Sequence, residues 1–207
     1  LNDPTYRPLF LTGNFGVAPL NAYLNAITFA VFEWFGAAPG PTAMRVTAAV
    51  MGALGVLAVF ALARELRRLD PQRLTPAFPL LAAAAMATLR WHIHFSRMGI
   101  EPIFVPLLWA AASWLLLAGW RRASFAAFAA CGVLLAAAMY SYQGAWIVPL
   151  LMVPLAGHLW LCGRGQDEQR RRLAGLLLAG GVAALLVLPL ALFFAGNPDL
   201  LVLRPAQ

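Results

Sequence analysis

A polar segment in an otherwise apolar chain carries four ionisable side chains at helical spacing. They are Arg90, His94, Arg97 and Glu101, separated by four, three and four residues. A helix through this segment would place all four on one face, although Pro102 disfavours helical geometry at Glu101. Two guanidiniums and an imidazole suit a phosphate or pyrophosphate, because arginine donates bidentate hydrogen bonds and stays charged. The alternative is that these side chains anchor a helix at lipid headgroups, and the residues by themselves favour that simpler role.

An aromatic turn is the second polar feature. Tyr140, Tyr142 and Gln143 precede Gly144, which permits a chain reversal between two apolar runs. The simplest role for these aromatic side chains is a belt at the membrane interface. They could also stack on a sugar and, with Glu101, line a substrate groove.

Metal chemistry is not expected. His92 and His94 are two residues apart, which is not a metal-binding spacing on a helix. Cys131 and Cys162 lie inside apolar runs, without the spacing of a disulfide framework or a zinc site.

Composition indicates a membrane protein. Of the 207 residues, 62% are hydrophobic and 11% are charged, and the mean hydropathy is +0.75. A soluble domain cannot bury that much apolar surface, so the bilayer must act as its solvent. The net charge of +7 does not indicate nucleic-acid binding, because the excess lies in short breaks between apolar runs.

The expected fold is an all-α, polytopic helix bundle with about six spanning helices. Small residues such as Gly52, Gly55, Gly175 and Gly180 are expected to let these helices approach closely. The predicted spans cover residues 43–64, 76–90, 102–120, 124–142, 144–162 and 173–196, and the second continues towards residue 95.

An amphipathic helix is expected before the first span, at residues 19–35. Asn21, Asn25 and Thr28 form a polar stripe on this otherwise apolar segment. Such a helix suits the membrane interface better than a crossing, although a spanning position stays open. The expected division is an outer-face loop over 1–42, a membrane bundle over 43–196, and the start of an outer loop or tail over 197–207.

The arginines predict which side of the membrane each loop occupies. All 15 basic residues are arginine, and most of them cluster in every second break between apolar runs. These clusters, at 64–73, 121–122 and 164–172, are expected to be solvated and cytoplasmic, with no further role. Arg45 and the 90–101 segment then fall on the opposite side, where Arg45 either snorkels to headgroups or makes a second phosphate contact.

The order of several short motifs resembles a known family. They are VAPLNAYL at 17–24, FG at 35–36, AMR at 43–45, AREL at 63–66, WHIHFSR at 91–97 and MYSY at 139–142. In this order they resemble the bacterial membrane glycosyltransferases of family 39, which are similar to protein O-mannosyltransferases and to the aminoarabinose transferases of lipid A. The resemblance covers residues 19–160.

That resemblance implies a GT-C architecture in the bacterial inner membrane. It implies a polyprenyl-phosphate sugar as donor, an acceptor on the outer face (protein, lipid or glycan), and no cofactor. Arg45 matches the family arginine at the start of the span after the first outer loop, and Ser96 and Arg97 match a Ser-Arg pair in the second. The resemblance therefore implies donor or phosphate contact for Arg45 and Arg97, with Ser96 beside Arg97. Arg90 and His94 join the candidate phosphate site through their helical spacing.

The chain also departs from this family. The family's first helix and the acidic motif beyond it would precede Leu1, so the catalytic base is unassigned and this piece alone is expected to be inactive. The alternative function is a non-catalytic polytopic protein, such as a transporter or an assembly subunit. That alternative predicts polar residues deep within the spans, and the predicted spans contain few.

Overall fold

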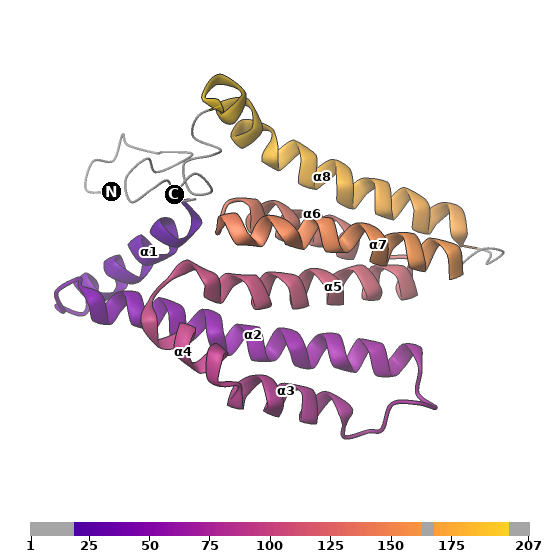
Figure 1. Cartoon of the computed structure of the whole chain (residues 1–207), viewed down its shortest axis with the longest axis horizontal. Helices are drawn as coiled ribbons and strands as arrows, with labels where there is room; N and C mark the ends of the chain where they lie inside the picture. Colours follow the sequence, from indigo (N-terminus) through magenta and orange to yellow (C-terminus); the bar gives the residue numbers. More distant parts are fainter. Residues whose placement is uncertain (1–18, 163–167, 199–207) are drawn as a thin grey trace.

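The computed structural model describes residues 19–162 and 168–198, which form helices joined by short turns (Figure 1). No strand occurs in these ranges, as the all-α prediction requires. A bilayer offers the backbone no hydrogen-bond partner, so an apolar chain satisfies its N–H and C=O groups within helices. The elements are α1 (Leu20–Trp34), α2 (Pro41–Leu69), α3 (Phe78–Thr88), α4 (Arg90–Met98), η1 (Glu101–Ile103), α5 (Phe104–Arg122), α6 (Phe125–Met139), η2 (Gln143–Trp146), α7 (Ile147–Cys162) and α8 (Gln169–Gly196).

Four helical segments are long and apolar enough to cross a membrane, which indicates a membrane protein. They are Pro41–Leu69, Glu101–Arg122, Gln143–Leu161 and Gln169–Gly196, and each coincides with a predicted span. The other two predicted spans contain shorter helices. With 11 residues α3 is about 16 Å long and with 15 residues α6 is about 22 Å long, against a hydrocarbon core of about 30 Å.

The expected continuous helix from residue 76 towards residue 95 is wrong. Leu89 adopts an extended conformation, with φ −65° and ψ 119°, and separates α3 from α4. Neither proline nor glycine marks this break in the sequence. Its physical reason is tertiary, because the new direction of α4 lays that helix on α2, as described below.

The polar stripe of α1 faces the protein. Asn25 is buried, and its Nδ2 donates to Asn21 Oδ1 at 3.2 Å. Thr47 of α2 donates its hydroxyl to Thr28 at 2.8 Å. The stripe read from the sequence thus attaches α1 to α2, while Ile27 and Trp34 on α1 are exposed and apolar. Whether α1 lies in the membrane interface stays a prediction.

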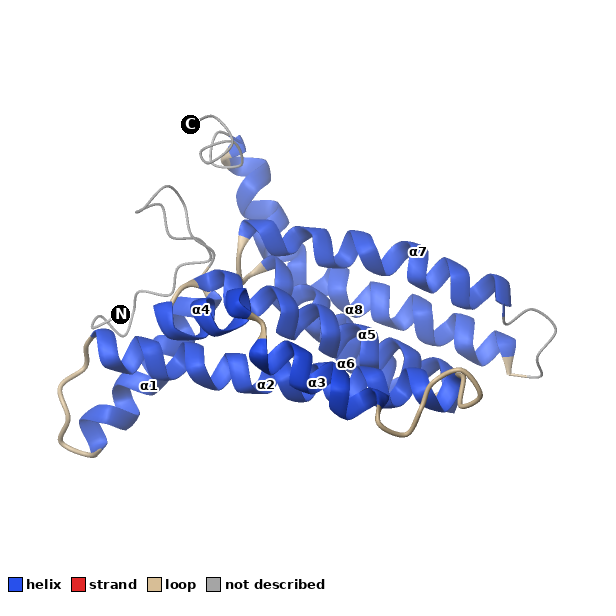
Figure 2. Ribbon diagram, turned by 60° about the horizontal axis from the view of Figure 1, so that its bottom comes forward, coloured by secondary structure: helices blue, strands red, loops and turns tan. Residues whose placement is uncertain are grey.

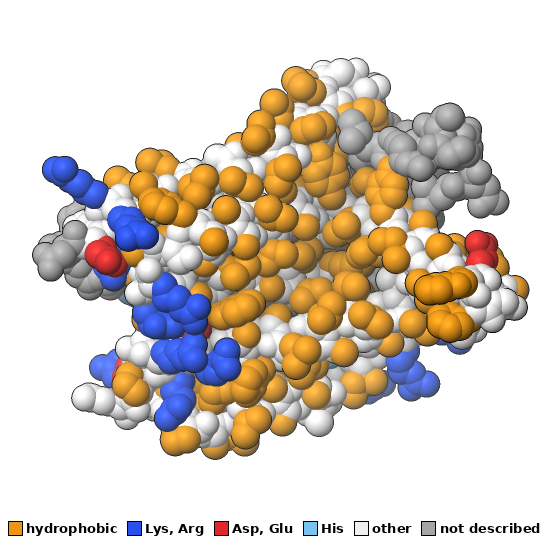
Figure 3. Space-filling model, turned by 180° about the vertical axis from the view of Figure 1, so that it is seen from behind, with side chains coloured by type: hydrophobic (Ala, Val, Ile, Leu, Met, Phe, Trp, Pro, Cys, Tyr) orange, Lys and Arg blue, Asp and Glu red, His pale blue; other side chains and the backbone are white. Residues whose placement is uncertain are grey.

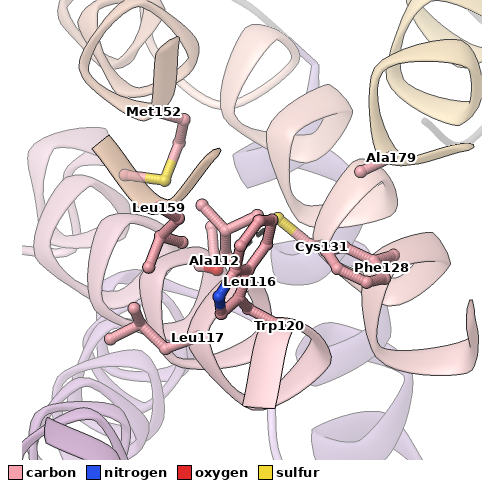
Figure 4. Packing of buried hydrophobic residues seen from close by; sticks show 9 residues of the cluster. All are labelled: Ala112, Leu116, Leu117, Trp120, Phe128, Cys131, Met152, Leu159 and Ala179. Atoms are coloured by element: carbon pink, nitrogen blue, oxygen red, sulfur yellow. Dashed lines mark hydrogen bonds between the residues drawn. The ribbon is translucent and has the colours of Figure 1, made fainter. Parts of the chain in front are cut away.

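Close contact between α6 and α8 depends on glycine. A Cβ on Gly132 would overlap the backbone of Ala179, and a Cβ on Gly175 would overlap the ring of Phe128. Gly180 has nothing within 4 Å of its Cβ position, so the close approach expected there does not occur among the described residues. The buried cluster around Phe128 also includes Trp120 of α5 (Figure 4).

Basic side chains gather at one end of the bundle. The turns joining α2 to α3 and α5 to α6 lie at the end opposite α1 and α4 (Figures 1 and 2). Arginine side chains cover that end in the space-filling view, and hydrophobic side chains cover the middle of the molecule (Figure 3). This is the arrangement that the predicted sidedness requires.

Two arginines at this end form ion pairs with a buried carboxylate. Glu65, with a side chain that is 0% exposed, accepts from Arg121 Nε and, at 3.1 Å, from Arg68 Nη1. The expectation that these arginines are merely solvated is therefore wrong. A buried carboxylate requires charged partners, and Arg121 supplies one from a helix that is 56 residues away in sequence.

Removing this partner should destabilise the bundle. We expect Arg121→Gln to lower the free energy of unfolding by about 2 kcal/mol, because it removes one charged partner of a buried carboxylate. Arg68 remains as the second partner of Glu65, which limits the loss. Denaturant unfolding in detergent micelles measures this loss. Arg122→Gln, at an exposed neighbour, is the control, and adding Glu65→Gln to Arg121→Gln should recover part of the loss. Equal losses in Arg121→Gln and Arg122→Gln would contradict the role of the pair.

Candidate functional site

The first component of the site is α4, whose two faces carry different residues. The helix begins after extended Leu89 and ends at Gly99, which has φ +75° and closes the helix in the left-handed conformation. His92 and Ser96 are four residues apart and face α2. Arg90 and Arg97 occupy the other, exposed side. Because α4 ends before Gly99, Glu101 lies outside this helix, in η1.

Buried His92 attaches α4 to α2. Its Nε2 lies 3.0 Å from the carbonyl oxygen of Gly52. A carbonyl only accepts, so Nε2 is the donor in this contact. Ser96 Oγ donates to the His92 carbonyl at 2.6 Å. Gly52 is required for this packing, because a Cβ at this position would overlap Ser96. A Cβ at Gly55 would lie 3.3 Å from His92 Cε1, which is also a tight contact.

Between α2 and α4 lies an open cavity of about 730 Å³. Its ionisable lining residues are three arginines and a histidine, and none of its lining residues is acidic. The remaining walls are largely apolar, including Val46, Ile93 and Met98. The lining residues are Thr42, Arg45, Val46, Ala49, Arg90, Ile93, His94, Ser96, Arg97 and Met98.

The cavity's guanidiniums are available to a ligand. Arg45, Arg90 and Arg97 are exposed, and none forms an ion pair within the ranges that the structure describes. This contrasts with the opposite end of the bundle, where Arg121 and Arg68 are held by Glu65. Unpaired guanidiniums beside an apolar wall suit an anion that carries an apolar group.

Every residue expected to contact a donor phosphate lines this cavity. Arg90, His94, Ser96 and Arg97 come from α4, and Arg45 comes from α2, 45 positions before Arg90 in sequence. Their roles stay predictions, but their convergence is a structural finding. Glu101, the fourth member of the sequence pattern, does not line the cavity.

The aromatic turn lies elsewhere. The Tyr140 hydroxyl donates to the Leu186 carbonyl at 3.0 Å, and Tyr140 lines a separate cavity of about 340 Å³ between α1, α6 and α8. Tyr142 packs against the buried cluster that contains Phe104 and Ala145. Gln143 begins η2. The structure therefore does not bring these three residues to the arginine-lined cavity.

His92 is the positioning residue that sequence reasoning missed. It was considered for metal binding, and among the described residues no three His, Cys, Asp or Glu side chains gather as a metal site. Two sequence signals could have revealed its role. The His92–Ser96 spacing of four residues defines one helix face, and Gly52 and Gly55 provide a matching depression on α2.

Comparisons of this chain with protein-family models, with curated proteins and with solved structures find no match. The chemistry of the cavity is therefore the basis for assigning a function. Its side chains can bind an anion and stabilise charge that develops on a leaving phosphate. No carboxylate lines it, so the described lining supplies no acidic general base.

Replacing His92 should loosen α4 without touching the cavity's charges. We expect His92→Leu to lower the free energy of unfolding by about 1 kcal/mol, because the hydrogen bond from Nε2 to the Gly52 carbonyl is lost. Exposed His94, on the same helix, provides the matched control, and His94→Leu should change stability by less than about 0.5 kcal/mol. Thermal unfolding of both variants in the same detergent checks this. A larger loss in His94→Leu would show that α4 is held differently.

Proposed function

We propose that this chain is part of an integral-membrane glycosyltransferase. It moves a sugar from a polyprenyl-phosphate donor to an acceptor on the outer face of the bacterial inner membrane. The observation that supports this most is the convergence of Arg45, Arg90 and Arg97 on one open cavity without acidic lining residues. The resemblance of the motif order to family 39 glycosyltransferases agrees with it.

The arginines act on the leaving group. In an inverting transfer the bond between the sugar C1 and the phosphate oxygen breaks, and its electron pair stays on the phosphate. The acceptor oxygen forms the new bond to C1 and gives its proton to a base. Arg45 and Arg97 stabilise the negative charge that grows on the phosphate, which lowers the barrier. The base is a carboxylate that the described cavity lining does not include.

An apolar wall beside the arginines suits a lipid-linked donor. Val46 and Ile93 line the cavity next to its guanidiniums, and both are exposed. A polyprenyl phosphate presents this combination of a charged head and an apolar chain. In the proposed arrangement the phosphate binds the guanidiniums, and the first isoprene units contact the apolar wall and then the bilayer.

The proposed architecture is a GT-C-like bundle of six spanning units. The shorter helices contribute two of these units, α6 and the broken pair α3–α4. The break at Leu89 has a function in this arrangement, because it turns the part of this unit that carries Arg90, His94 and Arg97 towards α2. α1 lies in the interface on the outer side, with its exposed apolar face towards lipid.

Transfer assays on the full-length protein test the proposal. Incubation with labelled polyprenyl-phosphate sugars should give transfer to membrane acceptors. Arg45→Gln and Arg97→Gln should each lower kcat/KM by about tenfold to a hundredfold, as expected for the loss of a charged hydrogen bond to phosphate. Arg122→Gln, at the opposite end of the bundle, should leave transfer unchanged.

Two outcomes would contradict the proposal. Transfer that is unchanged in Arg97→Gln would remove this arginine from the site. Tight binding of polyprenyl phosphate without transfer of any sugar would favour a non-catalytic lipid-binding or transport protein instead. Membrane insertion, checked by extraction and gel filtration, must be equal in all variants.

A further inference from the structure

The arginine-lined cavity carries more positive charge than the proposed donor carries negative charge. Three of its lining side chains are arginines, which stay protonated, and none of its lining residues is acidic. Arg45, Arg90 and Arg97 are all exposed. A sugar linked to polyprenyl phosphate is a phosphate diester, with a single negative charge shared by its pair of terminal oxygens. With one guanidinium on each of these oxygens, one arginine of the lining has no partner on the donor.

Cleavage of the donor changes both the charge and the oxygens of its phosphate. The bond between the sugar C1 and the bridging oxygen breaks, and the electron pair stays on that oxygen. The acceptor oxygen bonds to C1 and gives its proton to the base. The lipid product is a phosphate monoester with close to two negative charges at slightly alkaline pH. It has a third terminal oxygen, so its terminal oxygens match the three arginines of the lining.

Two contacts fix the direction of α4 along α2. His92 Nε2 lies 3.0 Å from the carbonyl oxygen of Gly52. A Cβ on Gly99, directly after α4, would lie 3.4 Å from the backbone of Met44. The two helices therefore run in opposite directions, and the last turn of α4 lies beside the first turns of α2.

The three arginines consequently divide into a pair and a single residue. Arg97 lies in the last turn of α4 and Arg45 lies near the start of α2, so they belong to the same end of the cavity. Arg90 begins α4, seven residues before Arg97. That separation is a rise of about 10 Å along the helix. The pair suits the terminal oxygens of the donor, and Arg90 remains for the oxygen that cleavage releases.

We propose that Arg90 is a catalytic residue that binds the oxygen released from the sugar, an inference that rests on the proposed glycosyl transfer. Arg45 and Arg97 hold the terminal oxygens of the donor phosphate. Arg90 donates hydrogen bonds to the bridging oxygen as its negative charge grows. An interaction that strengthens while the bond breaks lowers the barrier without tightening donor binding. The same contact makes the lipid monophosphate bind more tightly than the donor, so this product inhibits transfer.

Calorimetric titration compares the two states of the phosphate without any transfer. The full-length protein, in nonionic detergent at slightly alkaline pH, is titrated with farnesyl phosphate and with farnesyl methyl phosphate. The first is a monoester like the product, and the second is a diester with the charge of the donor. We expect the monoester to bind at least about tenfold more tightly, as one further charge-assisted hydrogen bond provides. Arg90→Gln should reduce this ratio to about twofold or less and leave diester affinity within about twofold.

Variants inside and outside the cavity provide the controls. Arg45→Gln should weaken both ligands by similar factors, because the oxygen that it binds is present in both. Arg90→Lys keeps the charge and should restore part of the ratio. Arg122→Gln, at the opposite end of the bundle, should change neither affinity. Gel filtration confirms that each variant remains folded.

Transfer kinetics of the full-length protein provide the second test. Arg90→Gln should lower kcat by about tenfold or more with little change in the KM of the donor, because its interaction forms in the transition state. Arg45→Gln should also raise the KM. Added farnesyl phosphate should inhibit the unsubstituted protein at lower concentrations than those that inhibit Arg90→Gln.

Several results would overturn the proposal. An unchanged monoester preference in Arg90→Gln would mean that the third oxygen has another partner. Equal losses of monoester and diester binding would mean that Arg90 contributes only general attraction to anions. Inorganic phosphate that binds as tightly as farnesyl phosphate would show a site for free anions without a lipid contact.

Failure of the proposed function gives a different result. The unsubstituted protein would then transfer no sugar, while the monoester preference and its loss in Arg90→Gln persist. That outcome would contradict glycosyl transfer and still support Arg90 as the partner of the third phosphate oxygen.

Discussion

The cost of burying charge in a bilayer is the constraint on which this structure depends. In the described ranges the arginine and acidic side chains lie in turns or near the ends of helices, and a buried charge requires partners. Glu65 shows the rule, because its fully buried carboxylate is held by Arg121 and Arg68 from two helices. Arg45, Arg90 and Arg97 at the opposite end have no carboxylate partner in the described chain. Cations that the protein itself does not neutralise are the natural place for an anionic ligand.

Much of the fold follows from the sequence, because hydrophobic length and arginine placement are local signals. The six predicted apolar segments all contain helices, and four are long enough to span. The spacing of Arg90, His94 and Arg97 predicted a shared face, and the predicted sidedness put Arg45 at the same end. Their convergence on one cavity needed the structure, because it depends on His92 of α4 meeting Gly52 of α2.

Features created by tertiary contacts escaped prediction. The break at Leu89 has no proline or glycine to announce it, and it exists because α4 packs across α2. The polar stripe of α1 predicted an amphipathic helix but not its partner, which is α2, where Thr47 donates to Thr28. The Arg121–Glu65 pair joins residues far apart in sequence, so it could not be read from local spacing. In each case the deciding contact is made with another helix.

Sidedness is the central claim, because an outer-face reaction needs the arginine-lined cavity on the side opposite the basic loops. Cysteine labelling measures it most directly. With Cys131 and Cys162 replaced by alanine, His94→Cys and Arg122→Cys are exposed to a membrane-impermeant maleimide in intact spheroplasts. We predict that His94→Cys is labelled without permeabilisation and that Arg122→Cys is labelled only after permeabilisation. The reverse pattern would place the cavity in the cytoplasm and contradict the proposed glycosyl transfer.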